Sequence, residues 1–380
     1  TDNAAGLLKE EMRLLDSLIL RVADVNQVPA GQALAVDRDA FAEAVTQALE
    51  NHPNISIIRE EVVTLPLVSE EPWIVASGPL TSEPLLQHLQ SLFGEEQLYF
   101  YDAAAPVVTA ESLDPDKVYR ASRYDKGEAD YFNCSFNEEE YTHFWHELCH
   151  AEQHPLHDFE RGHFFDACIP VEELALRGKD TLAFGPLKPI GLRDPSKIEP
   201  PYAVVQLRQD NVAGDLYGLV GFQTNLRFGE QRRIFRLIPG LEHAEFVRYG
   251  VMHKNSFLNT PKVLTTALQA REHQHLFFAG QLTGVEGYIE SAATGLLCGI
   301  NAVRYLQQSR MIVPPQQTML GALVYYVTHA AGKSFQPMNA VFGIMPPPDK
   351  RIKDKRLRNL FYSKRALEAM ESWKAEINLN

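Results

Sequence analysis

Residues 276–288 read LFFAGQLTGVEGY, an apolar strand pattern that runs through three glycines into the start of a helix. Glycine lets a ligand approach the backbone closely, and the free amides at the start of a helix attract negative charge. The pattern therefore predicts a cofactor-binding turn at the carboxyl end of a strand. A glycine turn that serves only to pack the helix on the sheet is the alternative.

A flavin suits such a turn. The reduced ring carries negative charge along its pyrimidine edge, which the amino end of a helix stabilises by about 0.3–1 kcal/mol. The predicted helix, from about Glu286 to Gln308, contains Ala292, Ala293, Gly295 and Gly299, and these small residues allow it to lie tightly against the sheet.

The α/β pattern extends to both ends of the chain. Strands are predicted at 33–36, 55–58 and 73–78, and helices at 39–50 and 319–328. Between them, residues 106–261 show short strands, many turns and isolated helices. We therefore expect an α/β fold with a discontinuous domain (1–105 and 262–380) that is interrupted by an inserted α+β domain (106–261).

Composition limits the kinds of partner and the cellular compartment that fit this chain. The 380 residues carry a net charge of -13, so any nucleic-acid surface must be local. The four cysteines are far apart and form no CxxC pair, which favours a reducing cytoplasm. No apolar run is long enough for a membrane span. The chain opens on Thr1 and enters a helical pattern through Leu18 at once, as expected of the interior of a longer chain.

The most basic stretch of the chain is residues 349–365. It is a candidate phosphate-contact strip, because Lys and Arg supply most sequence-independent affinity for nucleic acid. A solvated charged surface is the alternative. The candidate residues are Lys350, Arg351, Lys353, Lys355, Arg356 and Arg358. A second candidate set is Arg227, Arg232, Arg233 and Arg236.

Residues 146–150 read HELCH, which matches the H-E-x-x-H pattern of zinc peptidases. On a helix the two imidazoles lie on one face, and Glu172 or Glu173 could supply a third ligand. Five-residue patterns with three fixed positions also arise by chance, and His143, His154 and His157 indicate a His-rich helix surface. We expect no metal site here.

Cys168 precedes a helix that starts at a proline. The amides at a helix amino end favour the thiolate, which is the form that a nucleophilic or proton-shuttling thiol needs. From the residues alone, a buried and inert cysteine is the alternative.

The string from Gly280 to Ala302 resembles the carboxyl-terminal flavin motif of two tRNA-modifying flavoprotein families, TrmFO and GidA. Further segments, outside the motif that the two families share, resemble TrmFO. These segments are 122–127, 221–226, 235–242, 248–253, 335–340 and 350–355. The resemblance covers nearly the whole chain, and it is to the TrmFO family of folate-dependent tRNA-(uracil-5-)-methyltransferases.

This resemblance implies a glutathione-reductase-like FAD domain and a specific reaction. The family transfers a methylene group from methylenetetrahydrofolate to carbon 5 of the T-loop uridine of tRNA and reduces it to methyl with a flavin that NAD(P)H reloads. Uracil carbon 5 becomes nucleophilic once a thiolate adds at carbon 6. The resemblance places Cys168 on one of two catalytic cysteines, as nucleophile or as general base.

The resemblance also implies the cofactor contacts. The residues expected to bind FAD are Gly280, Gln281, Gly284, Val285, Glu286, Gly287 and Tyr288, with Tyr288 near the ring. The second catalytic cysteine and the loop that binds the ADP half of FAD are expected upstream of Thr1. We expect a cytoplasmic monomer or homodimer. The alternatives are the wobble-uridine pathway of the GidA relatives and a cofactor-free remnant.

Overall fold

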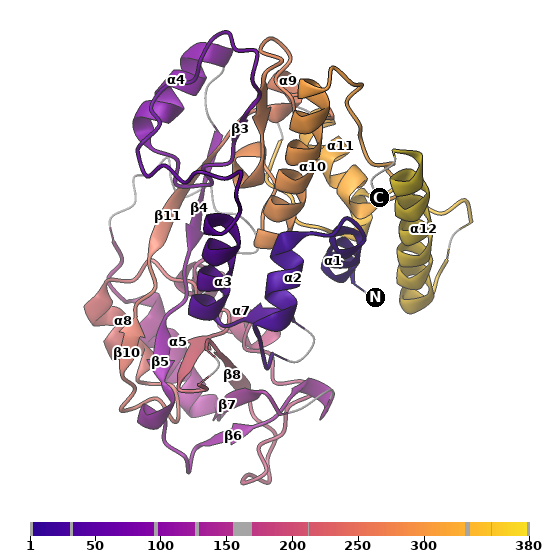
Figure 1. Cartoon of the computed structure of the whole chain (residues 1–380). Helices are drawn as coiled ribbons and strands as arrows, with labels where there is room; N and C mark the ends of the chain where they lie inside the picture. Colours follow the sequence, from indigo (N-terminus) through magenta and orange to yellow (C-terminus); the bar gives the residue numbers. More distant parts are fainter. Residues whose placement is uncertain are drawn as a thin grey trace. The chain divides into compact units, whose positions relative to one another are not determined.

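The computed structural model describes residues 3–30, 33–94, 98–125, 129–154, 169–211, 213–330, 335–350 and 352–377. The chain forms two compact units. Unit 1 comprises residues 1–21, 56–99 and 255–380, and unit 2 comprises residues 22–55 and 100–254. The chain passes from unit 1 to unit 2 within β4 (Leu98–Ala103) and returns to unit 1 within β11 (Met252–Phe257). These two strands pair as a two-stranded sheet (Figure 1).

Unit 1 has an α/β arrangement. Its strands β3 (Trp73–Val75) and β12 (Leu276–Phe278) are parallel, with Leu276 opposite Trp73 and Phe278 opposite Val75. Strand β12 is buried along its whole length, as expected for an apolar strand covered by helices. Helix α10 (Tyr288–Leu306) packs against both strands. The prediction of an α/β fold with a strand, a glycine turn and a long helix is confirmed.

Three further helices of unit 1 surround α1 (Ala4–Leu14). Helices α10, α11 (Met319–His329) and α12 (Lys355–Glu376) all contact it (Figure 1). The side chain of Glu11, on α1, is buried and accepts hydrogen bonds from the amides of Met319 and Leu320 at 2.6 and 2.9 Å. A carboxylate from one helix thus caps the amino end of another.

Unit 1 contains further helices and turns. They are α4 (Glu83–Phe93), α9 (Thr260–Val263) and the 3-10 turns η4 (Gly280–Thr283) and η5 (Phe342–Ile344). The pattern that predicted one helix through Leu18 was wrong in one detail. Asp16 has φ 56°, which ends α1 before α2 (Leu18–Val25) begins.

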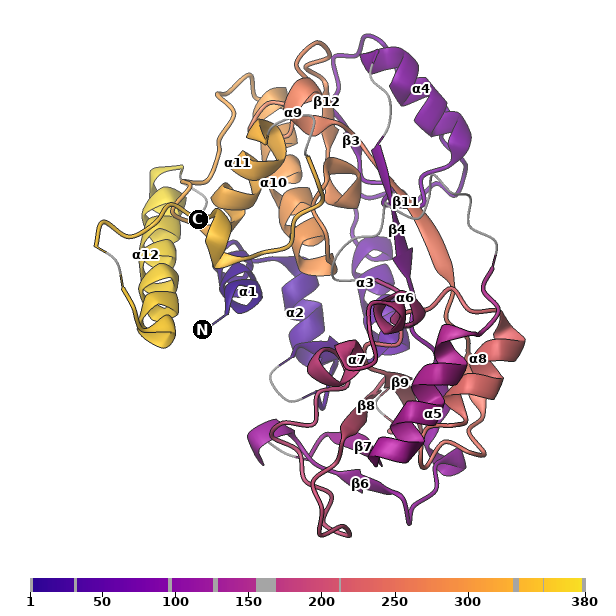
Figure 2. The ribbon, with the colours of Figure 1, turned by 180° about the vertical axis from the view of Figure 1, so that it is seen from behind.

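Unit 2 is built on a six-stranded sheet with the order β10-β5-β9-β8-β7-β6, in which every neighbouring pair is antiparallel. The strands are β5 (Val107–Thr109), β6 (Val118–Arg120), β7 (Tyr131–Phe136), β8 (Ala203–Gln209), β9 (Leu216–Leu219) and β10 (Phe246–Arg248). Unit 2 also contains the helices α5 (Glu138–Cys149), α6 (Val171–Leu176), α7 (Thr181–Phe184) and α8 (Phe228–Phe235) (Figure 2). The 3-10 turns are η1 (Ala110–Ser112) and η2 (Arg123–Asp125).

Aromatic side chains from the sheet and the helices fill the core of unit 2. Phe136 of β7 packs on Phe144 of α5 with ring centroids 5.2 Å apart. Phe222 packs edge-on against Phe235 of α8, also at 5.2 Å. All four rings are fully or almost fully buried, so they contribute both apolar area and specific ring geometry.

Unit 2 also contains residues 22–55, which the sequence grouped with the first domain. Here β1 (Gln27–Val28) pairs with β2 (Ala35–Val36), and α3 (Arg38–Glu50) follows. The hydroxyl of Tyr131 donates to the carbonyl of Ala30 at 3.2 Å, a contact that links this segment to β7. Such a link between distant segments is not visible in local hydrophobic periodicity.

The strand predicted at residues 55–58 is wrong. This segment is irregular, and Ile58 is 73% exposed. Branched apolar residues favour extended backbone, but a strand forms only with a hydrogen-bonded partner, and no described residue pairs with this segment. None of the helices that the structure describes is long and apolar enough to cross a membrane.

Candidate functional site

The turn after β12 is shaped by three glycines with positive φ: Gly280 (72°), Gly284 (80°) and Gly287 (105°). The turn η4 begins at Gly280 and has Gly284 as its C-cap, and Gly287 is the N-cap of α10. A Cβ on Gly284 would collide with the ring of Phe335, and one on Gly287 would collide with the carboxylate of Glu290. Both the backbone angle and the available space therefore require glycine here.

Residues 338–340 run beside this turn. The amide of Met338 donates to the carbonyl of Gly284, and the amide of Glu286 donates to the carbonyl of Met338, both at 3.0 Å. The Asn339 side chain donates to the carbonyl of Glu286, also at 3.0 Å. The segment 335–340, which the sequence singled out only by its family resemblance, thus fixes the path of the predicted cofactor turn.

Glu290 is part of this site, although the sequence reasoning gave it no role. Its Oε1 accepts the amide of Ala340 at 2.8 Å, so its carboxylate joins α10 to the 338–340 segment. Burial raises its pKa, and the Ala340 amide offsets part of that rise. A glutamate three residues after the helix-capping glycine was the available sequence signal.

The seven residues predicted to bind FAD all lie in this one turn. Gln281 donates through its side-chain amide to both carboxylate oxygens of Glu286, at 2.8 and 2.9 Å. The side chain of Tyr288 is 91% exposed, so it is available to a planar ligand. Val285 is buried, and its backbone forms a parallel bridge with Met338.

The donor set of this turn fits the ring end of a flavin. The first amides of a helix have no intrahelical partner, and Gly287 offers no capping side chain to occupy them. Gly295 and Gly299 leave open space along α10, because a Cβ on either would meet nothing within 4 Å. The helix therefore presents backbone donors and a partial positive charge beside an unobstructed surface.

The cysteines differ in accessibility. Cys134 and Cys298 are buried, and burial raises the pKa of both thiols far above the ordinary value. The Cys298 thiol donates to the carbonyl of Phe278 at 3.1 Å, so it bonds α10 to β12. Cys149 is half-buried, and burial also raises its pKa. The candidate Cys168 lies outside the described residues, two positions before Pro170, the N-cap of α6.

The basic tail is exposed around the start of α12. Lys350, Lys353, Lys355 and Arg356 are exposed, Arg358 is half-buried, and Arg351 lies outside the described residues. Asp354 caps the helix by accepting the Leu357 amide at 2.8 Å, but the first turn contains no acidic residue. Cations at the positive end of a helix are locally unfavourable, so this strip attracts anions rather than stabilising its own helix.

The second basic set is engaged with other groups. Arg233 pairs with Glu147 and Glu230, and Arg227 pairs with Glu152 at 2.8 Å. Arg232 donates to the Tyr249 hydroxyl, and Arg236 donates to the carbonyl of Ala244. The acidic partners offset part of the positive charge of this set, which makes it a weaker phosphate surface than the tail.

The HELCH string lies at the end of α5. Glu147, the residue that a zinc peptidase would use as a base, forms an ion pair with Arg233, which lowers its pKa. Glu172 is buried and bonded to Thr224 and Asn225, which prevents it from acting as a third ligand. Within the described ranges, no three or more His, Cys, Asp or Glu side chains gather as metal ligands.

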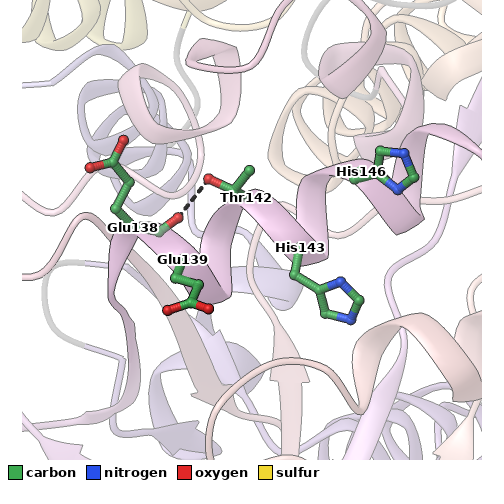
Figure 3. A pocket seen from close by; sticks show the side chains of 5 residues that line it. All are labelled: Glu138, Glu139, Thr142, His143 and His146. Carbon is green, nitrogen blue, oxygen red and sulfur yellow. Dashed lines mark hydrogen bonds between the residues drawn. The ribbon is translucent and has the colours of Figure 1, made fainter.

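A shallow pocket lies on the same helix. It is lined by Glu138, Glu139, Thr142, His143 and His146, all from α5, and the Thr142 hydroxyl donates to the carbonyl of Glu138 at 2.6 Å (Figure 3). Its walls come from a single helix, and the residues predicted to act in catalysis or in binding are not among them. We assign no ligand to it.

Comparison with known proteins defines the fold class first. The family model described as Glucose inhibited division protein A matches residues 1–310. A solved structure of GidA from Aquifex aeolicus (form II crystal) aligns with a TM-score of 0.71 at 16% identity, covering 99% of this chain and 67% of that one. The form I crystal aligns with a TM-score of 0.63 at 17% identity, covering 89% and 60%. The fold is that of the GidA flavoproteins.

Sequence identity then defines the family. The methylenetetrahydrofolate--tRNA-(uracil-5-)-methyltransferase TrmFO of Anoxybacillus flavithermus is 56% identical over 371 residues, which cover 98% of this chain and 85% of that protein. TrmFO of Shouchella clausii is 54% identical over 375 residues, which cover 99% and 85%. The chain belongs to the TrmFO family, and the resemblance found in its sequence is confirmed.

Proposed function

We propose that this chain catalyses the folate- and FAD-dependent methylation of carbon 5 of a uridine in tRNA, with NAD(P)H as reductant. The observation that carries this proposal is identity of 53–56% to TrmFO methyltransferases over nearly the whole chain. The turn before α10 supports it, because its open amides and glycines suit a flavin ring.

The FAD ring end would be held by Gly280, Gln281 and residues 284–288. When bound, the flavin supplies the hydride that reduces the transferred methylene group to methyl. The chain's own contribution is positional. The amino end of α10 would stabilise negative charge on a bound flavin ring, and the exposed Tyr288 would offer it an aromatic face.

We assign the reactive thiol to Cys168, as nucleophile or general base. The other three cysteines are poor candidates, because burial raises the pKa of Cys134, Cys149 and Cys298 and two of them are shielded from solvent. A catalytic thiol needs the opposite environment, with access to substrate and a favoured thiolate. Addition of the thiolate at carbon 6 makes carbon 5 nucleophilic, and carbon 5 then forms the bond to the one-carbon group. A base removes the carbon 5 proton, and the carbon 6–sulfur bond breaks to release the thiolate.

For tRNA we assign the phosphate contacts to the tail: Lys350, Arg351, Lys353, Lys355, Arg356 and Arg358. We further propose that the target is the T-loop uridine and that the enzyme acts in the cytoplasm as a monomer or homodimer. Residues 106–261 form the substrate domain in this proposal, and the flanking segments 1–105 and 262–380 form the FAD domain.

One observation favours a second function. The family model described as Glucose inhibited division protein A matches residues 1–310. The resemblance to GidA implies modification of the wobble uridine. The two functions predict different products. The identity to TrmFO, at 56% against 16% for a solved GidA structure, favours methylation.

The test is transfer of a labelled one-carbon group. The chain is incubated with FAD, NADPH, carbon-labelled methylenetetrahydrofolate and unmodified tRNA, and the tRNA is digested and sequenced by mass spectrometry. The proposal predicts a labelled methyl group on uracil carbon 5 in the T-loop fragment. Label in the anticodon fragment would overturn it.

A further inference from the structure

Helix α10 begins without a capping side chain over its first amides, because its N-cap is Gly287. The usual capping residues, Ser, Thr, Asp and Asn, would place an oxygen on one of these amides. Among the described residues, none accepts a hydrogen bond from the amide of Tyr288 or Ile289. A helix end without a cap loses stability, so another group has to supply the cap.

Glu290, in the first turn of α10, supplies it with a buried carboxylate. The residue is 6% exposed, and its Oε1 accepts the amide of Ala340 at 2.8 Å. The carboxylate also accepts the amide of its own residue. The partial positive charge at the amino end of a helix stabilises a negative group there. Glu290 therefore caps the helix from within the protein and leaves the amides of Tyr288 and Ile289 open.

The space for this carboxylate exists because residue 287 is glycine. A Cβ on Gly287 would collide with Oε2 of Glu290, and the positive φ of 105° also disfavours a side chain. A glycine of the predicted flavin motif thus makes room for a side chain of the protein itself. Gly287 and Glu290 act as a pair, in which one residue vacates the position that the carboxylate of the other occupies.

Glu290 also holds the neighbouring chain that braces the turn. Met338 donates its amide to the carbonyl of Gly284 and accepts the amide of Glu286, both at 3.0 Å. Ala340 follows two positions later and donates its amide to Glu290. The bonds run from the turn through this chain and back to α10, all within unit 1. Loss of the carboxylate would free one end of the brace.

We propose that Glu290 is a positioning residue for the flavin ring, whose carboxylate holds the turn and the open amides of α10 in the arrangement that receives the ring. The proposal rests on the proposed function, because it takes this turn as the flavin site. A binding site whose supporting groups are loose places its ligand about 1 Å from the best geometry. A purely structural residue would change stability alone, whereas a positioning residue also changes the bound flavin.

The test compares Glu290→Ala and Glu290→Gln with Glu11→Ala. Gln keeps an oxygen that can accept the Ala340 amide, whereas Ala removes it. Glu11 is the matched control, because it is also a buried carboxylate of unit 1, and it accepts the amides of Met319 and Leu320 at the start of α11. FAD titration, the absorbance spectrum of bound flavin and urea unfolding are measured for each variant.

Glu290→Ala should weaken FAD binding by roughly 5- to 150-fold, the range expected when a buried amide loses its acceptor. It should also shift the visible bands of the bound flavin, because the surroundings of the ring change. Glu290→Gln should restore most of the affinity and the wild-type spectrum. Glu11→Ala should lower the free energy of unfolding and leave the FAD affinity and the spectrum unchanged.

Hydrogen exchange in the absence of FAD reports on the brace itself. The amides of Met338 and Ala340 should exchange faster in Glu290→Ala, and at the wild-type rate in Glu290→Gln and Glu11→Ala. Unchanged exchange of these two amides in Glu290→Ala would overturn the proposal, whatever the protein does with flavin.

Two results of the FAD titration would also overturn it. One is a Glu290→Ala variant that binds FAD with wild-type affinity and spectrum, and the other is an equal loss of affinity in Glu11→Ala. If Glu290→Ala does not fold, Glu290→Asp takes its place, because its shorter side chain withdraws the carboxylate from the Ala340 amide. The proposed function fails separately, since label in the anticodon fragment would overturn T-loop methylation and leave the comparison of FAD affinities standing.

Discussion

The turn before α10 in unit 1 and the segment 223–227 in unit 2 are built in opposite ways. The turn is made mainly of backbone: three glycines with positive φ, and main-chain bonds to residues 338–340. The segment in unit 2 is fixed by buried side chains whose partners are 52, 53 and 71 positions away. The turn can be seen in one short stretch of sequence, whereas the segment exists only after folding.

This difference has a functional consequence. The turn in unit 1 should be disturbed most by substitutions that alter main-chain conformation. The segment in unit 2 should be disturbed most by the loss of single side chains. The predictions that follow test this contrast, starting with the largest expected effect.

The largest effect should come from Cys168→Ala. Removing the proposed thiol should lower methylation by on the order of 10³-fold or more, because the covalent route is lost. The absorbance of bound flavin should not change, since the predicted flavin residues belong to unit 1. Cys298→Ala is the control and should retain activity. Wild-type turnover in Cys168→Ala would end the assignment.

Charge on the tail should matter next. Replacing Lys350, Lys353, Lys355 and Arg356 by Gln should weaken tRNA binding and reduce the slope of log affinity against log salt by up to about 0.9 per lost contact. The control is Arg227→Gln together with Arg232→Gln, from the second basic set. If the control variant loses as much tRNA affinity, the phosphate contacts would be assigned to unit 2. Filter binding across a salt series measures the tRNA affinity and its salt slope for each variant.

Gly287→Val tests the backbone nature of the turn. At φ 105° a branched side chain is strained, and its Cβ would collide with the Glu290 carboxylate. A strain of about 1–3 kcal/mol should weaken flavin binding by roughly 5- to 150-fold. Gly295→Ala is the matched control. The alanine Cβ at position 295 would meet nothing within 4 Å, and the Gly295→Ala substitution should stabilise α10 by about 0.5–1 kcal/mol. Flavin titration and urea unfolding distinguish the two variants.

Glu11 sharpens the comparison, because it is a buried side-chain contact in unit 1. Burial raises its pKa from 4.5 to about 8, so the folded state holds this proton more tightly than the unfolded state does. Its contribution to stability is therefore greatest below pH 4.5 and decreases as the pH rises toward 8.

The Glu11→Gln variant should lose this part of the pH dependence, which at its steepest amounts to about 1.4 kcal/mol per pH unit. The free energy of unfolding in urea, measured at several pH values for both proteins, gives the two slopes. Parallel slopes would show that Glu11 titrates alike in the folded and unfolded chain.

The sequence predicted those parts of the fold that depend on local pattern. The apolar run ending at Phe278, the three glycines and the small residues after Tyr288 were sufficient to place β12, the turn and α10. The strand and the turn have causes within a few residues, namely burial of an apolar run and positive φ. The predicted flavin residues therefore all fall in one turn. The prediction that Gly295 and Gly299 let α10 lie tightly against the sheet is wrong, because a Cβ on either would meet nothing within 4 Å.

The remaining features depend on contacts between distant residues. Ile58 belongs to an apolar branched run that reads as a strand, yet the segment stays irregular because none of the described residues pairs with it. Glu11 caps α11 across 308 and 309 positions, and Glu172 bonds to Asn225 across 53. Sequence periodicity does not show which buried acid will meet which amide.

The most direct test of the central claim is a titration of the purified chain with FAD, followed by visible absorbance. If the turn before α10 belongs to a TrmFO flavin site, the wild-type chain should bind FAD and show yellow flavin bands that are weakened by Gly287→Val and retained in Cys168→Ala. FAD that binds Gly287→Val as tightly as the wild-type chain, with both chains folded, would contradict the account.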